Sequence, residues 1–144
     1  MSKKLSRKEE REGGFTLLEL LVVLAILSVL AALAVPRVLN YLGSAKTDAA
    51  AVQIERLGTV LDLYRLDVGR YPSEEDALGA LMTRPPEAKG WNGPYLKKSE
   101  MLLDPWGRQF VYRHPGEHGD YDLVSLGADG QEGGEGEDRD TVSW

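Results

Sequence analysis

Cysteine is absent from the 144 residues, and histidine occurs only twice. The chain therefore has neither disulfides nor a thiol nucleophile. Small domains outside the cytoplasm often hold their loops with disulfides. If this domain lies there, another device must hold its loops.

The two histidines follow the order His-x-x-Glu-His, which is typical of one class of zinc peptidases. That chemistry needs both His114 and His118 on one face of a helix. Pro115 and Gly116 favour a turn instead. No glycine-rich loop suited to phosphate precedes a helix. The sequence therefore predicts a protein that is not an enzyme.

Positive charge is scarce near the C-terminus, where residues 120–144 hold eight acidic side chains and one basic side chain, Arg139. The whole chain has 17 Lys and Arg against 23 Asp and Glu, a formal net charge of -6. This balance argues against a surface that binds nucleic acid.

Charge is almost missing from residues 15–35, which are apolar except for Thr16, Glu19 and Ser28. The segment has the length of roughly 20 residues that a bilayer requires. An acid near the centre of a membrane helix costs roughly 2.5–3.5 kcal/mol, and less toward its end. Glu19 is thus either retained for a partner or close enough to the interface to escape the cost.

A short net-positive segment precedes this apolar run, with five basic residues at Lys3, Lys4, Arg7, Lys8 and Arg11. A secretory signal peptide is cleaved after its apolar core. Here Gly13 and Gly14 come before the core, so cleavage there would leave the apolar helix on the mature protein. The basic flank predicts a cytoplasmic leader, with the C-terminal part across the membrane.

Residues 14–23 read Gly-Phe-Thr-Leu-Leu-Glu-Leu-Leu-Val-Val, which closely resembles the start of the type IV pilin class. In that class a membrane peptidase cuts after the glycine and methylates the new N-terminus. The resemblance implies cleavage between Gly14 and Phe15 and methylation of Phe15. It also implies that Glu19 pairs with the α-ammonium of Phe15 in a neighbouring subunit and sets their axial register.

Apolar residues recur at spacings of three and four from residue 38 to residue 68, which predicts one helix over 15–68. We expect its 57–68 part to pack on the head domain and its 15–52 part on other subunits. Gly69 and Pro72 end the helix. A short helix over 73–82 and strands at 109–113, 121–125 and 95–97 complete an α+β fold, a long helix on a small antiparallel sheet.

The acidic residues of the last loop alternate with glycines, a pattern that suits a hard cation. Asp129 and Asp140 have the spacing of an EF-hand loop, but Gln131 and Gly133 are poor ligands and no helix is predicted on either side. A solvated, flexible acidic tail is the other interpretation.

Several motifs together resemble the major pseudopilins of type II secretion systems: residues 62–67, 71–72, 104–107 and 125–130, and a final tryptophan. That family binds Ca²⁺ in the last loop. The resemblance implies carboxylate ligands from Asp129 and Asp140 and carbonyl ligands from Leu126 and Val142. Because the 138–141 segment departs from the usual ending, Asp138 is a possible substitute or addition. A bound ion would replace the missing disulfides.

The resemblance also implies an organisation and a function: a leader at 1–14, a transmembrane and filament-core helix at 15–36, and a periplasmic head at 37–144. Cleaved copies would leave the inner membrane and polymerise into a periplasmic pseudopilus that drives folded proteins across the outer membrane. The implied partners are minor pseudopilins, the prepilin peptidase and the inner-membrane assembly platform. Two alternatives remain, namely a type IV pilin for adhesion or motility and an anchored calcium-binding domain that never polymerises.

Overall fold

The computed structural model describes residues 13–144, so the predicted leader lies outside the described residues except for Gly13 and Gly14. A long helix, α1, spans Leu17–Val68 and includes Pro36. Three strands follow, β1 at Val111–Arg113, β2 at Asp122–Ser125 and β3 at Thr141–Val142, with short 3₁₀ helices η1 (Ala77–Leu81), η2 (Ser99–Leu102) and η3 (Gly136–Asp138). Residues contact one another mainly within two separate units, and the boundary between these units lies between Arg37 and Val38.

The first unit contains the apolar start of α1. This is the one helix among the described residues that is long and apolar enough to cross a membrane, with a mean hydropathy of 2.8 over its best window and none of that window buried. Within it, the Ser28 hydroxyl donates a hydrogen bond to the Leu24 carbonyl at 2.7 Å, so this polar group is satisfied inside the helix. The described residues leave this surface uncovered, which suits lipid or other subunits.

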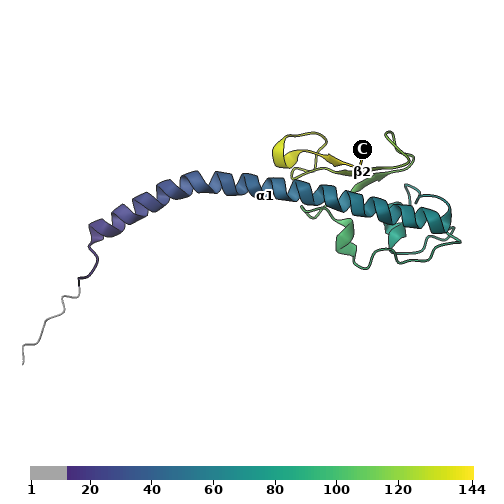
Figure 1. Cartoon of the computed structure of the whole chain (residues 1–144), viewed down its shortest axis with the longest axis horizontal. Coiled ribbons are helices and arrows are strands. Elements are labelled where there is room, and N and C mark those ends of the chain that lie inside the picture. The colour runs from purple at the N-terminus through teal and green to yellow at the C-terminus, as the bar shows by residue number, and fades with distance from the viewer. Residues whose placement is uncertain (1–12) are drawn as a thin grey trace, which may run out of the picture. The chain divides into compact units, whose positions relative to one another are not determined.

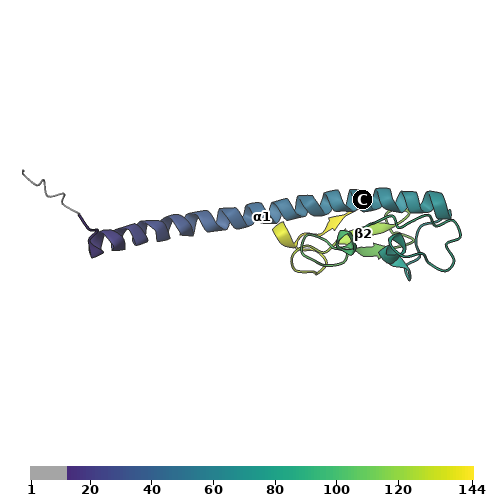
Figure 2. The ribbon, with the colours of Figure 1, turned by 90° about the horizontal axis from the view of Figure 1, so that it is seen from below.

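The second unit, Val38–Trp144, places the sheet and loops beside the C-terminal half of α1 (Figures 1 and 2). One helix face is buried through Ile54, Leu57, Leu61 and Tyr64, and for the last three residues the periodicity predicted this. These side chains pack with others to form one core, including Tyr71, Leu78, Leu81, Leu96, Phe110 and Leu123. Burying a leucine side chain contributes about 1.5–3 kcal/mol, so this stripe holds the helix on the head.

Gly58 lies inside α1, where glycine costs about 1 kcal/mol relative to alanine. A Cβ at this position would stand 2.8 Å from the Tyr121 hydroxyl oxygen. The glycine therefore makes room for a side chain of the head to lie against the helix.

The sheet has the order β1-β2-β3 with both pairs antiparallel. The predicted antiparallel pair is confirmed with shorter strands. The prediction of a third strand at 95–97 is wrong, because the Tyr95 and Leu96 amides donate to the Leu81 carbonyl at 2.8 and 3.3 Å rather than to the sheet. The third strand is β3, and it closes the acidic loop onto β2.

The predicted helix over 73–82 is also shorter than expected. Ser73 accepts a hydrogen bond from the Asp76 amide at 3.2 Å, so it caps a turn. Ala77 then takes a φ of 46°, a conformation that an α-helix cannot include. The segment therefore contains only the short 3₁₀ helix η1, which begins at Ala77.

Candidate functional site

The predicted processing site lies immediately before α1. Gly14 and Phe15 are exposed, and 93% of the surface of Phe15 is accessible. A Cβ added to Gly13 or Gly14 would meet no other atom within 4 Å. The described part of this segment is therefore accessible from solvent.

Glu19 takes part in a reciprocal hydrogen-bond arrangement at the start of α1. Its Oε2 accepts a hydrogen bond from the Thr16 amide at 3.0 Å, while its own amide donates to Thr16 Oγ1 at 3.2 Å. This is a capping box, which satisfies two amides that would otherwise lack partners. The Thr-x-x-Glu spacing is the sequence signature of this arrangement, although the predictions for Glu19 concerned only a partner subunit or the membrane interface.

The acidic stretch is a folded loop between β2 and β3, which excludes the EF-hand arrangement of flanking α-helices. Asp129 Oδ1 accepts a hydrogen bond from the Gln131 amide at 3.0 Å. Asp140 Oδ2 accepts one from the Gly133 amide at 2.9 Å. The two predicted carboxylate ligands thus shape the same short turn, each with one oxygen.

Two glycines allow the loop to close tightly around the Asp138 carbonyl. Gly127 and Gly134 have φ of 60° and 89°, which other residues rarely adopt. A Cβ on either one would stand 2.6 Å from the Asp138 carbonyl oxygen. The backbone of Asp138 is thereby fixed, while its side chain is exposed.

The 104–108 turn braces this loop from the other side. Asp104, only 5% exposed, accepts hydrogen bonds from the Ser125 hydroxyl at 2.7 Å and the Arg108 amide at 2.9 Å. The Arg108 guanidinium donates to the carbonyls of Gly127 and Ala128, both at 2.6 Å. Arg108 was not identified from the sequence, because nothing in its neighbours along the chain indicates these distant carbonyls.

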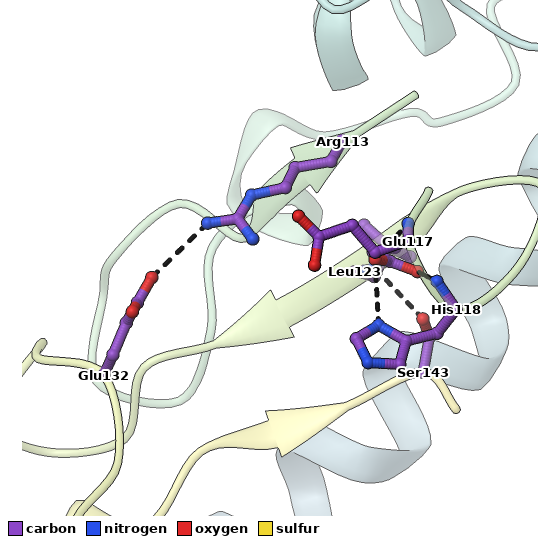
Figure 3. A network of polar contacts seen from close by, with 7 residues as sticks. Arg113, Glu117, His118, Leu123, Glu132 and Ser143 are labelled. Carbon is purple, nitrogen blue, oxygen red and sulfur yellow. Dashed lines mark hydrogen bonds and ion pairs between the residues drawn. The ribbon is translucent and has the colours of Figure 1, made fainter. Parts of the chain in front are cut away.

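The two residues after β3 are held by β2 and by the β1–β2 connection (Figure 3). Leu123 and Ser143 exchange two hydrogen bonds, each of 3.0 Å. The His118 ring stacks on Trp144 with centroids 3.8 Å apart. Its Nδ1 lies 3.1 Å from Asp122 Oδ2. His118 therefore has a structural role.

Asp122 is the buried acid of this cluster, with 2% of its surface exposed. Burial raises the pKa of Asp122, but hydrogen bonds from the Glu117 amide, the His118 ring and the His118 amide outweigh it, so the pKa lies below its ordinary value. The carboxylate is thus ionised at neutral pH.

The two histidines do not form a zinc site. His114 and His118 lie in the connection between β1 and β2 rather than on a helix, as Pro115 and Gly116 predicted. His114 Nδ1 lies 2.7 Å from the Asp120 carbonyl, whereas His118 contacts Asp122. Across residues 13–144, no three Asp, Glu or His side chains converge in a way that could hold a metal.

The loop nevertheless has two separate features that suit a hard cation, an unpaired carboxylate oxygen and a backbone carbonyl with a spare lone pair. Asp140 Oδ1 is buried and has no hydrogen-bond partner among the described residues. An unpaired buried carboxylate oxygen is costly, and a divalent cation would satisfy it. The Leu126 carbonyl accepts only one hydrogen bond here, from the Gly130 amide at 3.1 Å, which leaves a lone pair for a ligand.

Comparison with known proteins gives consistent similarities. A profile of type II secretion system protein G matches residues 37–144, and the prokaryotic N-terminal methylation motif matches residues 11–35. The type II secretion system core protein G of Pseudomonas aeruginosa is 44% identical over 141 residues, covering 95% of this chain and 98% of that protein. The Vibrio cholerae protein of the same description is 42% identical, covering 96% and 95%.

A solved structure supports the same fold. The crystal structure of the major pseudopilin from the type 2 secretion system of enterohaemorrhagic Escherichia coli matches with a TM-score of 0.60 and 32% identity. The match covers 70% of this chain and 88% of that one. The predicted long helix on a small antiparallel sheet is confirmed.

Proposed function

Because the chain belongs to the protein G family of type II secretion systems, the major pseudopilins, we propose that its copies polymerise into a periplasmic filament that drives export of folded proteins. The observation that carries the proposal is the family match over the whole head, joined to an apolar helix that residues 13–144 leave uncovered. Helices of this kind bury their surface against one another in a filament. The subunit acts by assembly, without catalysis.

The pathway to the filament starts in the inner membrane. Residues 1–14 form the cytoplasmic leader, 15–36 the membrane and filament-core helix, and 37–144 the periplasmic head. The prepilin peptidase cuts between Gly14 and Phe15 and methylates Phe15, for which the methylation-motif match is the support. The assembly platform and minor pseudopilins then receive the subunit.

Glu19 provides the register between subunits in this proposal. After cleavage, Phe15 carries a positive α-ammonium group. The Glu19 carboxylate of a neighbouring copy offsets its desolvation and fixes the axial step. The capping box holds this carboxylate in the first turn of the helix.

The acidic loop binds Ca²⁺ in the proposed function. The carboxylates of Asp129 and Asp140 and the carbonyls of Leu126 and Val142 would hold the ion, with Asp138 as the substitute or additional ligand. The buried, unpaired Asp140 Oδ1 supports this assignment. The ion would offset part of the negative charge of the loop and fix β3 on β2, the work that disulfides perform in other small domains.

Complementation tests the proposed function. The full-length chain would be produced in a type II secretion strain that lacks its own protein G, followed by an assay of exoprotein release and of sheared filaments. Restored secretion with filaments composed of this chain is expected. Comparing secretion by a Phe15→Ala or Gly14→Ala variant with that of the unchanged chain shows whether the function depends on processing. Filaments without secretion would favour a type IV pilin. Membrane-bound monomers without secretion would favour the anchored calcium-binding domain.

A further inference from the structure

One side chain joins the acidic loop to the long helix. In both views η3 lies beside α1 (Figures 1 and 2). Glu137 of η3 accepts a hydrogen bond on Oε1 from the Trp106 indole at 2.9 Å. The Lys46 ammonium of α1 lies 3.6 Å from the same oxygen. The Glu137 carboxylate is thus shared between the 104–108 turn and the helix.

The helix is shaped to receive this side chain. Gly43 is buried inside α1, where glycine lowers helix stability by about 1 kcal/mol relative to alanine. A Cβ at Gly43 would stand 3.1 Å from Glu137 Cβ and 3.2 Å from its Oε2. Such contacts are tighter than side chains normally tolerate, so the glycine allows Glu137 to lie flat on the helix.

The backbone of Glu137 belongs to the loop at the same time. Its carbonyl accepts a hydrogen bond from the Ala128 amide at 3.0 Å, which ties the two sides of the loop together. Asp138 follows directly, and its carbonyl is enclosed by Gly127 and Gly134. A movement of the loop backbone at Ala128 or Asp138 would therefore also move the backbone of Glu137, and with it the Glu137 side chain.

We propose that Glu137 is a positioning residue that latches the 126–140 loop to α1 at Gly43 and Lys46, and that Ca²⁺ in the loop orders α1 through this latch. The second half of the proposal rests on the proposed calcium site, whereas the latch itself does not. The helix next to the latch exposes large apolar side chains, at Val38, Leu39, Tyr41 and Leu42. In a filament, the state of the loop would thus set the rigidity of a subunit-packing surface.

Amide hydrogen exchange of the full chain in detergent micelles, with Ca²⁺ or with chelator, tests the proposal at residues 43–50 and 126–140. Glu137→Met keeps the side-chain length but removes the acceptor and the charge, and Glu137→Gln restores a neutral acceptor. Glu135→Met is the matched control, because Glu135 is exposed in the same loop. Residues 54–64 report whether a variant loosens the whole head.

In the wild type, chelation should speed exchange in both segments. In Glu137→Met, exchange at 43–50 should be roughly fivefold faster or more with Ca²⁺ present, the scale of a lost charged hydrogen bond. The chelator should then change only the loop, and Glu137→Gln should lie between the two. Glu135→Met should behave as wild type, and 54–64 should be unchanged in all.

Unchanged exchange at 43–50 in Glu137→Met would overturn the latch. A chelator effect at 43–50 that persists in this variant would overturn the coupling to the ion. If chelation changes neither segment of the wild type, the calcium proposal fails, and the comparison of Glu137→Met with wild type still decides the latch. The indole N–H resonance of Trp106, assigned with Trp106→Phe, gives an independent readout, since Glu137→Met should shift it and Glu135→Met should not.

Discussion

Asp140 and Gly133 are joined by a hydrogen bond of 2.9 Å from the glycine amide to Asp140 Oδ2, while Asp140 Oδ1 stays buried and unpaired among the described residues. One carboxylate oxygen therefore shapes the loop, and the other is free for a ligand. This division favours the proposed calcium site over a solvated acidic tail, and it makes Asp140 the most informative residue of that site.

Asp140→Asn should weaken Ca²⁺ binding about tenfold or more, because it removes a full ligand charge while an amide oxygen can still accept the Gly133 amide bond. Calorimetric titration of the full chain in detergent measures the change. Chelation at an ion concentration of 100 times Kd should cost the wild type about 2.7 kcal/mol, or roughly 10 °C in Tm.

Glu135→Gln is the control for this titration, since it removes one exposed negative charge from the same loop. It should change the affinity little. Equal losses in the two variants would mean that the loop attracts Ca²⁺ only through its overall charge, and unchanged binding by Asp140→Asn would remove Asp140 from the ligand set.

Asp122 predicts how acid affects the head. Its folded-state pKa is lowered, so the carboxylate contributes stability that is fully present above the ordinary aspartate pKa of 3.8 and is lost as pH falls through the folded value. Asp122→Asn should therefore be less stable than wild type at neutral pH, and the gap should narrow below about pH 4. Denaturant unfolding at a series of pH values measures it. A gap of constant size down to pH 2 would contradict the assignment.

Two leucines on opposite faces of α1 test how the helix is held on the head. Leu61 is fully buried, whereas Leu66 is 80% exposed. Leu61→Ala should lower the free energy of unfolding by about 2–5 kcal/mol through lost burial and a residual cavity. Leu66→Ala removes the same atoms and should stay within about 0.5 kcal/mol. Similar losses in chemical denaturation would mean that the exposed face is also packed in solution.

The sequence predicted those features that follow from local pattern. The spacing of Leu57, Leu61 and Tyr64 indicated the buried face of the helix, and the short run at 121–125 indicated β2. The third strand was missed because Thr141 and Val142 pair with β2 only after a long loop closes. This pairing is non-local, and the identity of two residues does not predict it. For the same reason the Arg108 contacts with the loop carbonyls, and the fit of Glu137 on Gly43, could only be seen in the fold.

Glu19 has two roles that three variants can separate. Glu19→Gln keeps a capping-box residue but removes the charge. Thr16→Val removes the cap hydroxyl and keeps the charge, whereas Glu19→Ala removes the charge and the acceptor for the Thr16 amide. If Glu19 pairs with the Phe15 ammonium of a neighbouring subunit, Glu19→Gln and Glu19→Ala should abolish filaments in the secretion strain, while Thr16→Val should retain them. Normal filaments from Glu19→Gln together with loss in Thr16→Val would assign Glu19 to its own helix, since the cap would then be the only function the carboxylate performs.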